Sequence, residues 1–170
     1  MHPSHPFWSL DVPRFDGQLL LTPCPGTQQV SAPHALSQLQ LAGTRALITL
    51  VTADELAAQG LHRLGAESET RGMAWYHLPI RDDEAPDAQF EQAWRQLLPE
   101  LISLLRDGKQ VAIHCRGGSG RTGLVAAALL MALGQPQPEA MACVRAHRPR
   151  AFTLASHRLW LDGWGARLAD

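Results

Sequence analysis

One ten-residue segment, His114 to Gly123 (HCRGGSGRTG), gathers residue types that suit nucleophilic chemistry on an anion. It follows a short apolar strand, 111–114, and leads into a predicted helix, 121–133. Amide N–H groups at a helix N-terminus have no intrahelical partner, and the helix dipole adds positive potential there. Glycines let the backbone curl so that successive amides converge on one point. The segment therefore predicts an anion-binding loop made of Arg116, Gly117, Gly118, Ser119 and Gly120.

Cys115 and Arg121 stand six positions apart in this segment, across one turn of such a loop. A guanidinium there can bind two phosphate oxygens at once. The same positive environment favours the thiolate form of a cysteine, and a thiolate attacks phosphorus to give a covalent phosphocysteine. Thr122 could then hydrogen-bond the sulfur when it leaves. We expect Cys115 to be the nucleophile and Arg121 the phosphate ligand, although a lone buried cysteine is usually structural.

Two nucleotide-binding motifs overlap this loop and are excluded. Residues 118–123 match G-x-G-x-x-G, but that fingerprint requires a following strand with an acidic residue about twenty positions on. Residues 135–146 instead follow the pattern of a proline-led helix. A triphosphate-binding P-loop requires a lysine before its Ser or Thr, and this segment has none.

The segment HCRGGSGRTG resembles the HC-x5-R-[ST] signature of the protein tyrosine and dual-specificity phosphatase superfamily. Residues 21–26 (LTPCPG) and 77–82 (HLPIRD), with Pro86 and Asp87 after them, resemble the kinase-associated phosphatase group in order and spacing. The resemblance covers roughly residues 20–161. It implies a phosphomonoesterase without metal or cofactor, with the α/β cysteine-phosphatase fold, in which His114 helps to orient the cysteine. A structural histidine that is buried with its ring nitrogens hydrogen-bonded is also compatible with that role.

A leaving alkoxide or phenolate needs a proton, so a carboxylic acid must reach the leaving oxygen. Four acidic residues follow the predicted strand 73–78: Asp82, Asp83, Glu84 and Asp87. By resemblance to the family, Asp82 is the expected acid and Asp83 the alternative. Asp87 is expected to cap the helix that follows.

Several other residues keep two interpretations. Arg116 either recognises a further negative charge of the substrate or forms a surface ion pair. His147, Arg148 and Arg150 either form part of the pocket wall or satisfy the C-terminus of a helix.

The segment 151–156 departs from the family pattern. Relatives often carry glutamines here that help to place the hydrolytic water. This chain has Phe152 and Ser156 instead, while Thr153 matches. The resemblance therefore leaves open how water is positioned in the second step.

Predicted strands alternate with predicted helices along the chain. The expected strands are 18–21, 46–51, 73–78 and 111–114, and the expected helices are 35–41, 54–60 with Asp54 as N-cap, 87–105, 121–133, 140–146 and 154–168. This order predicts an α/β fold with a central, mainly parallel sheet flanked by helices and a helical C-terminal third. We expect one domain over residues 1–170, with 1–17 as an irregular arm that packs Phe7 and Trp8 onto the body.

Composition limits the partners. The formal net charge is -1 and the pI is about 6.7, without a clustered basic face, which argues against nucleic acid as a partner. No apolar stretch reaches membrane-spanning length, so we expect no membrane insertion. Three cysteines are too few for a disulfide framework, and no secretory signal is visible, which favours the cytoplasm. We expect a monomer that acts on a phosphorylated protein or a small phosphate.

Three alternative functions remain. The first is a phosphatase of a phosphoinositide, nucleotide or other small phosphate, although lipid phosphatases usually place more lysine in the loop. The second is sulfur transfer or arsenate reduction, although rhodanese-like loops have a shorter spacing from cysteine to arginine. The third is a catalytically inactive phosphate-binding module, against which the intact Cys115, Arg121 and candidate acid argue.

Overall fold

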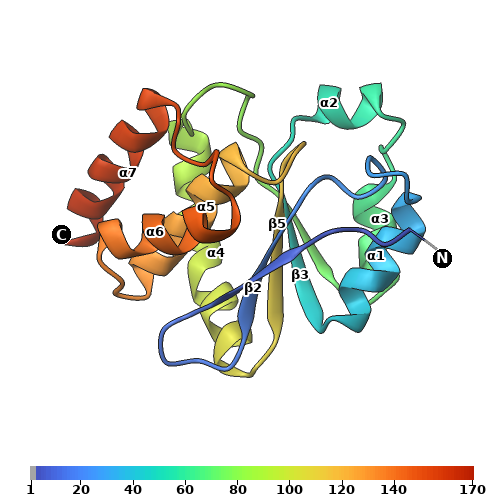
Figure 1. Cartoon of the computed structure of the whole chain (residues 1–170), viewed down its shortest axis with the longest axis horizontal. Helices are drawn as coiled ribbons and strands as arrows, with labels where there is room; N and C mark the ends of the chain where they lie inside the picture. Colours follow the sequence, from blue (N-terminus) through green and yellow to red (C-terminus); the bar gives the residue numbers. More distant parts are fainter. Residues whose placement is uncertain (1–2) are drawn as a thin grey trace.

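The computed structural model describes residues 3–170 and contains a five-stranded sheet between two layers of helices (Figure 1). The strands are β1 (Trp8–Asp11), β2 (Gln18–Thr22), β3 (Thr44–Thr49), β4 (Ala74–His77) and β5 (Gln110–His114). Their order across the sheet is β1-β2-β5-β3-β4. The four strands β2, β5, β3 and β4 are parallel, and β1 pairs antiparallel with β2 at one edge. The predicted mainly parallel sheet is therefore confirmed.

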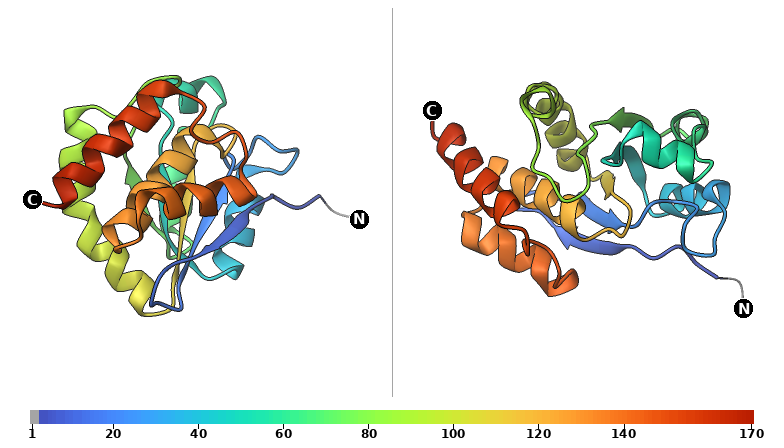
Figure 2. Two further views of the ribbon diagram at one scale, coloured as in Figure 1. Left: turned by 60° about the vertical axis from the view of Figure 1, so that its left-hand side comes forward. Right: turned by 90° about the horizontal axis from the view of Figure 1, so that it is seen from above.

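The helices fall into two groups on opposite faces of the sheet (Figures 1 and 2). They are α1 (Ala32–Leu41), α2 (Ala53–Ala58), α3 (Leu64–Glu69), α4 (Ala88–Arg106), α5 (Gly120–Ala132), α6 (Gln137–His147) and α7 (Ala155–Leu168). Helices α1 and α3 contact β3 and β4, whereas α4 and α5 contact β5. Helices α6 and α7 pack against α5, which gives the predicted helical C-terminal third. None of the helices described between residues 3 and 170 is long and apolar enough to cross a membrane.

Strand β5 and helix α5 form the centre of the molecule. The middle of β5 is completely buried, as expected for a strand with parallel neighbours on both sides. Helix α5 is apolar on nearly all sides, and eleven of its thirteen residues are buried. The loop between them is consequently held at both ends by the best-packed elements of the fold.

Parallel strands bring their carboxyl ends to the same edge of a sheet, and three loops meet there. Strand β5 leads into the loop 115–119, β4 into the segment 78–87, and β3 into the turn before α2. The predicted anion loop, the predicted acid and the start of α2 therefore lie next to one another.

The N-terminal arm is more ordered than predicted. Within its described part, residues 3–17, Trp8–Asp11 forms β1 and pairs with Gln18–Leu21, because a strand edge was available on β2. Phe7 is 36% exposed and does not pack onto the body as expected. Met1 and His2, which belong to the predicted arm, lie outside the described residues.

Two further predictions needed correction near α2. Thr52, not Asp54, is its N-cap, because Thr52 forms a reciprocal capping box with Glu55. Helix α3 follows directly and was not anticipated; its six residues are too few to show a clear apolar period.

Candidate active site

The loop between β5 and α5 turns its carbonyl oxygens outward. The carbonyls of residues 116–118 each accept a hydrogen bond from outside the loop. The donors are the backbone N–H of Cys24, at 3.0 Å from the first, and the guanidinium of Arg148, at 2.8 and 2.9 Å from the other two. Among residues 3–170 no acceptor pairs with the amides of residues 116–121. These amides and the N-terminus of α5 thus have the arrangement that an anion-binding nest requires.

Gly118 is the residue that lets the loop lie this close to β2. Its φ is +77°, and a Cβ at this position would lie 2.6 Å from the carbonyl carbon of Thr22 and 2.7 Å from the nitrogen of Pro23. A Cβ at Gly117 or Gly120 would meet no atom within 4 Å. A side chain is therefore excluded at Gly118 by both space and backbone conformation.

Cys115 follows β5 directly and is 4% exposed. The Nδ1–H of His114 donates to the Cys115 carbonyl at 3.0 Å, so Nε2 is the acceptor and receives the Thr49 hydroxyl at 2.7 Å. Trp75 Nε1–H in turn donates to that hydroxyl oxygen at 2.7 Å. Burial lowers the pKa of His114 to about 4, although the bond to the Cys115 carbonyl opposes this. These contacts favour a neutral His114 whose ring is hydrogen-bonded to the backbone of Cys115.

Arg121 is buried at the first turn of α5 and is held by Glu55 and by the backbone of Ile80. Its Nη1 donates to Glu55 Oε2 at 2.8 Å and to the Ile80 carbonyl at 2.9 Å, and its Nη2 donates to Glu55 Oε1 at 3.0 Å. Burial acts to lower the pKa of Arg121, but the contacts with Glu55 outweigh it and raise the pKa.

These contacts leave one edge of the guanidinium for an anion. Of the five N–H donors of Arg121, two on Nη1 and one on Nη2 are used. The remaining Nη2–H and the Nε–H lie parallel on one edge of the guanidinium and form no hydrogen bond within residues 3–170, and Asp82 Oδ1 lies 3.6 Å from Nη2. An edge with two parallel donors is the geometry that can bind two oxygens of one phosphate.

Glu55 was not predicted as a site residue. Partial burial acts to raise its pKa, but hydrogen bonds from Arg121 and Thr52 lower it to about 2, so Glu55 is ionised. The sequence signal that could have found its location is Thr52-x-x-Glu55, which marks a helix start after strand β3. The pairing with Arg121 itself is visible only in the folded chain.

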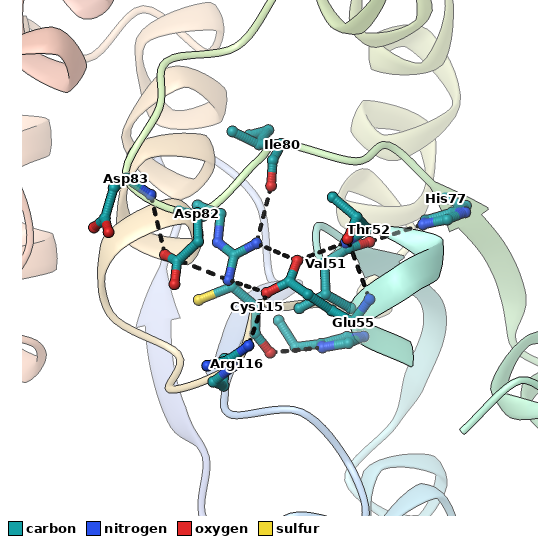
Figure 3. Close-up of polar contacts among 11 residues, drawn as sticks. Val51, Thr52, Glu55, His77, Ile80, Asp82, Asp83, Cys115 and Arg116 are labelled. Atoms are coloured by element: carbon teal, nitrogen blue, oxygen red, sulfur yellow. Dashed lines mark hydrogen bonds and ion pairs between the residues drawn. The ribbon is translucent and has the colours of Figure 1, made fainter. Parts of the chain in front are cut away.

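The two candidate acids differ in orientation. Asp82 Oδ1 lies 3.6 Å from Arg121 Nη2, and Figure 3 places its carboxylate on the same side as the sulfur of Cys115. Asp83 has a φ of +62°, and its carboxylate points away while its backbone N–H donates to Asp82 Oδ1 at 3.1 Å. Asp87 caps α4 as predicted, because its Oδ1 accepts the N–H of Phe90 at 2.8 Å. The geometry thus favours Asp82 over Asp83.

Arg116 adopts the ion-pair alternative. Its Nη2 lies 3.5 Å from Glu55 Oε1, and its side chain is largely exposed. Thr122 is completely buried, and its hydroxyl has no hydrogen-bond partner among the described residues. A free hydroxyl directly after Arg121 is compatible with the predicted bond to the leaving sulfur.

The cationic residues after α6 adopt different positions. Arg148 reaches the loop carbonyls and also lies over the Trp8 ring, with its guanidinium carbon 4.0 Å from the ring centroid. Arg150 lines a cavity of about 460 Å³ with Arg148, Gly117 and Ser119. Of these two residues, only Arg148 forms hydrogen bonds with the loop. The sequence alone had left both alternatives open.

The cleft beside the loop has a volume of about 780 Å³. It lies between the start of α2 and the segment after β4, and its lining includes Glu55, Asp82 and Arg116. Phe152, at one expected glutamine position, is buried with a φ of +65° and does not line this cleft.

Solved structures with a similar fold are phosphatases. A kinase-associated phosphatase whose catalytic cysteine is substituted by serine superposes with a TM-score of 0.86 at 23% identity, covering 99% of this chain and 98% of that one. The active form of Tk-PTP superposes with a TM-score of 0.72 at 29% identity, covering 98% and 99%.

Two curated proteins are similar to this chain over part of its length. Cyclin-dependent kinase inhibitor 3 of Rattus norvegicus is 32% identical over 96 residues, which is 56% of this chain and 44% of the relative. The same protein of Homo sapiens is 31% identical over 96 residues, again 56% and 44%. The match thus spans less than half the length of these curated relatives.

The model of one protein family, described as "Tc-R-P: Polymorphic toxin system, DSP-PTPase phosphatase", matches residues 25–135. This range includes β3, β4 and β5, the acid-bearing segment, the complete anion loop and most of α5. With the signature loop folded as an anion nest around Cys115, the chain belongs to this family of DSP-PTPase phosphatases within the dual-specificity phosphatase superfamily.

Proposed function

We propose that this protein hydrolyses phosphomonoesters of phosphorylated proteins through a phosphocysteine intermediate. The observation that carries the proposal is the loop itself. Its amides are free of protein acceptors, its carbonyls are fixed outward, and Arg121 keeps one two-donor edge available. A loose phosphoryl transition state needs such positioning and charge stabilisation above all.

In the first step the Cys115 thiolate attacks phosphorus while the bond from phosphorus to the leaving oxygen breaks. The loop amides and Arg121 hold the three equatorial oxygens. Asp82, on the same side of the loop as the sulfur, gives its proton to the leaving oxygen, so the dephosphorylated product departs as a neutral alcohol or phenol.

In the second step water attacks the phosphocysteine. The Asp82 carboxylate takes a proton from that water, the phosphorus–sulfur bond breaks, and inorganic phosphate is released. The free hydroxyl of Thr122 hydrogen-bonds the departing sulfur. Because Phe152 stands where relatives often place a glutamine, the water depends mainly on Asp82 and the loop.

A protein substrate is supported by the shape and charge of the site. The 780 Å³ cleft is lined by the acid-bearing segment and the start of α2, and its volume leaves room for the chain on either side of a phosphorylated residue. The added cation of the loop, Arg116, is paired with Glu55 and gives little support to a substrate with several phosphates.

Release of p-nitrophenol from p-nitrophenyl phosphate in the presence of EDTA tests the chemistry. We expect turnover in the wild type, none in Cys115→Ser, and reduced turnover with a changed pH profile in Asp82→Ala. Activity that survives in Cys115→Ser would exclude the phosphocysteine mechanism. If the folded wild type bound phosphate without turnover, the protein would be a phosphate-binding module.

Substrate class requires a second comparison. We expect phosphotyrosine, phosphoserine or phosphothreonine peptides to give a higher kcat/KM than phosphoinositide or nucleotide substrates, and the reverse order would favour a small phosphate. We further propose that the protein acts as a monomer and that it works in the cytoplasm, where cysteines such as its three free ones stay reduced. Mass measurement in solution and localisation of a tagged chain test those points.

A further inference from the structure

The segment that carries the candidate acid is exposed and has few attachments to the body. Its four residues 81–84 are all exposed, whereas Ile80 before them and Pro86 after them are buried. Inside the segment, the Glu84 N–H donates to the Arg81 carbonyl at 3.1 Å and so closes a turn. The turn alone does not fix its direction relative to the phosphate loop.

A buried histidine on α7 provides an attachment. His157 is 1% exposed, and its Nε2 lies 2.9 Å from the carbonyl oxygen of Glu84. A carbonyl can only accept, so Nε2 carries the proton and donates. Within residues 3–170, no other side chain donates a hydrogen bond to the backbone of residues 81–84.

The hydrogen bond from His157 holds Glu84 at one end of the turn, whereas Arg121 contacts Asp82 nearer the other end. Asp82 faces Arg121 at 3.6 Å, and the next residue, Asp83, takes a left-handed conformation so that its N–H reaches the Asp82 carboxylate. Fixing the Glu84 carbonyl therefore fixes the peptide groups that orient Asp82. A left-handed Asp costs about 1–2 kcal/mol, so the turn needs such outside support.

We propose that His157 is a positioning residue for proton transfer: its hydrogen bond to Glu84 holds the segment 81–84 so that Asp82 faces the leaving oxygen. This inference rests on the proposed function, in which Asp82 protonates that oxygen. Burial lowers the pKa of His157, although the Glu84 carbonyl opposes this, which is consistent with a neutral ring that donates from Nε2. His157 does not itself touch the substrate.

The inference has a specific kinetic consequence. A weakly basic leaving group such as p-nitrophenolate departs with little help from an acid, whereas phenolate, a stronger base, depends on a well-placed proton. Loss of acid positioning must therefore lower kcat/KM for phenyl phosphate more than for p-nitrophenyl phosphate. A general loss of folding would lower both equally.

The experiment compares the ratio of kcat/KM for these two substrates in His157→Leu and His157→Gln. We expect the ratio of p-nitrophenyl phosphate to phenyl phosphate to be roughly tenfold higher in the Leu variant than in the wild type. This is a part of the rate enhancement of about 10²–10⁴-fold that acid catalysis contributes. The Gln variant keeps an N–H donor and should restore most of the wild-type ratio. Arg158→Met is the matched control, because Arg158 donates to the Phe152 carbonyl and not to the acid segment.

Asp82→Asn and Asp83→Asn separate failure of the inference from failure of the proposed function. If Asp82→Asn changes the ratio and His157→Leu does not, the positioning role of His157 is wrong and the proposed chemistry stands. If neither Asn variant changes the ratio, the acid lies elsewhere, and both the inference and the assignment of Asp82 are wrong, while turnover in Cys115→Ser still decides the phosphocysteine mechanism. Should His157→Leu fail to fold, His157→Phe replaces it.

Discussion

Glu55 is the residue that orients the guanidinium of Arg121, the side chain expected to bind phosphate. Its two carboxylate oxygens occupy one end of Arg121, and its place is fixed by the capping box with Thr52. An arginine without this partner could rotate its guanidinium, and its free edge would no longer face the nest. The orientation of the cation is thus established before any phosphate binds.

We predict that Glu55→Gln lowers kcat/KM for p-nitrophenyl phosphate by roughly 10- to 100-fold, which corresponds to the 1.5–3 kcal/mol of a charged hydrogen bond. Gln keeps the shape and one acceptor but loses the charge. Steady-state kinetics measures the effect. Asp54→Asn is the control, because Asp54 is an exposed neighbour that lines the same cleft without contacting Arg121. An equal loss in both variants would indicate general electrostatics instead.

Gly118 and Gly117 give a matched test of backbone constraint. Gly118→Ala combines a φ of +77° with a Cβ at 2.6 Å from the Thr22 backbone, whereas Gly117→Ala meets no atom. We predict that Gly118→Ala lowers the free energy of unfolding by more than about 1–2 kcal/mol, the cost of the left-handed conformation alone. Gly117→Ala should stay within about 0.5 kcal/mol. Urea unfolding measures both, and equal stabilities would contradict the geometry.

At the scale of elements, the phosphate loop is supported by one segment from the C-terminal part of the chain and one from the N-terminal part. Arg148, just after α6, donates to two loop carbonyls, and the ring of Trp8 in β1 covers its guanidinium. Strand β1 is the antiparallel edge strand added by the N-terminal arm. The arm therefore contributes to the order of the catalytic loop without reaching the site itself.

We predict that Arg148→Met weakens competitive inhibition by inorganic phosphate roughly tenfold, because loop amides bind phosphate well only while their carbonyls are held outward. Arg148→Lys, with one donor position in place of two, should fall between Met and wild type. Arg145→Met is the control: Arg145 also lies over an aromatic ring, that of Phe152, but does not touch the loop. Unchanged inhibition in Arg148→Met would show that the loop holds its shape alone.

Prediction from sequence succeeded where the physical cause is local. The anion loop needs only an apolar strand, glycines, Cys115 and Arg121 within a few residues, and all of these are adjacent in the chain. The Glu55–Arg121 pair joins residues 66 positions apart, and the His157–Glu84 bond joins residues 73 positions apart. Such contacts depend on how the elements pack, which neither spacing nor resemblance could specify.

At the scale of the whole molecule, three histidines among residues 3–170 are buried in separate places: His5 in the arm, His114 behind the nucleophile and His157 on α7. Burial lowers the pKa of each below 6.5, although a backbone hydrogen bond opposes the shift in each case. A protonated ring at these positions would lose its water, and a single backbone hydrogen bond does not make up for that loss. The fold therefore favours the neutral form of all three.

This preference predicts acid destabilisation with a defined sign. Below pH 6.5 the unfolded chain binds protons on these histidines that the folded chain does not, so stability is lost as pH falls. For His114 the loss runs from 6.5 to its folded pKa of about 4 and amounts to about 3 kcal/mol in full. Glu55, whose pKa is lowered to about 2, adds a further loss of stability in the same direction below pH 4.5.

The midpoint of urea unfolding should therefore be clearly lower at pH 5 than at pH 7. His157→Gln should reduce that difference, and replacement of the exposed His62 by Gln should leave it unchanged. Equal midpoints at the two pH values would mean that the buried histidines are protonated in the folded protein, against the tautomers that their contacts require.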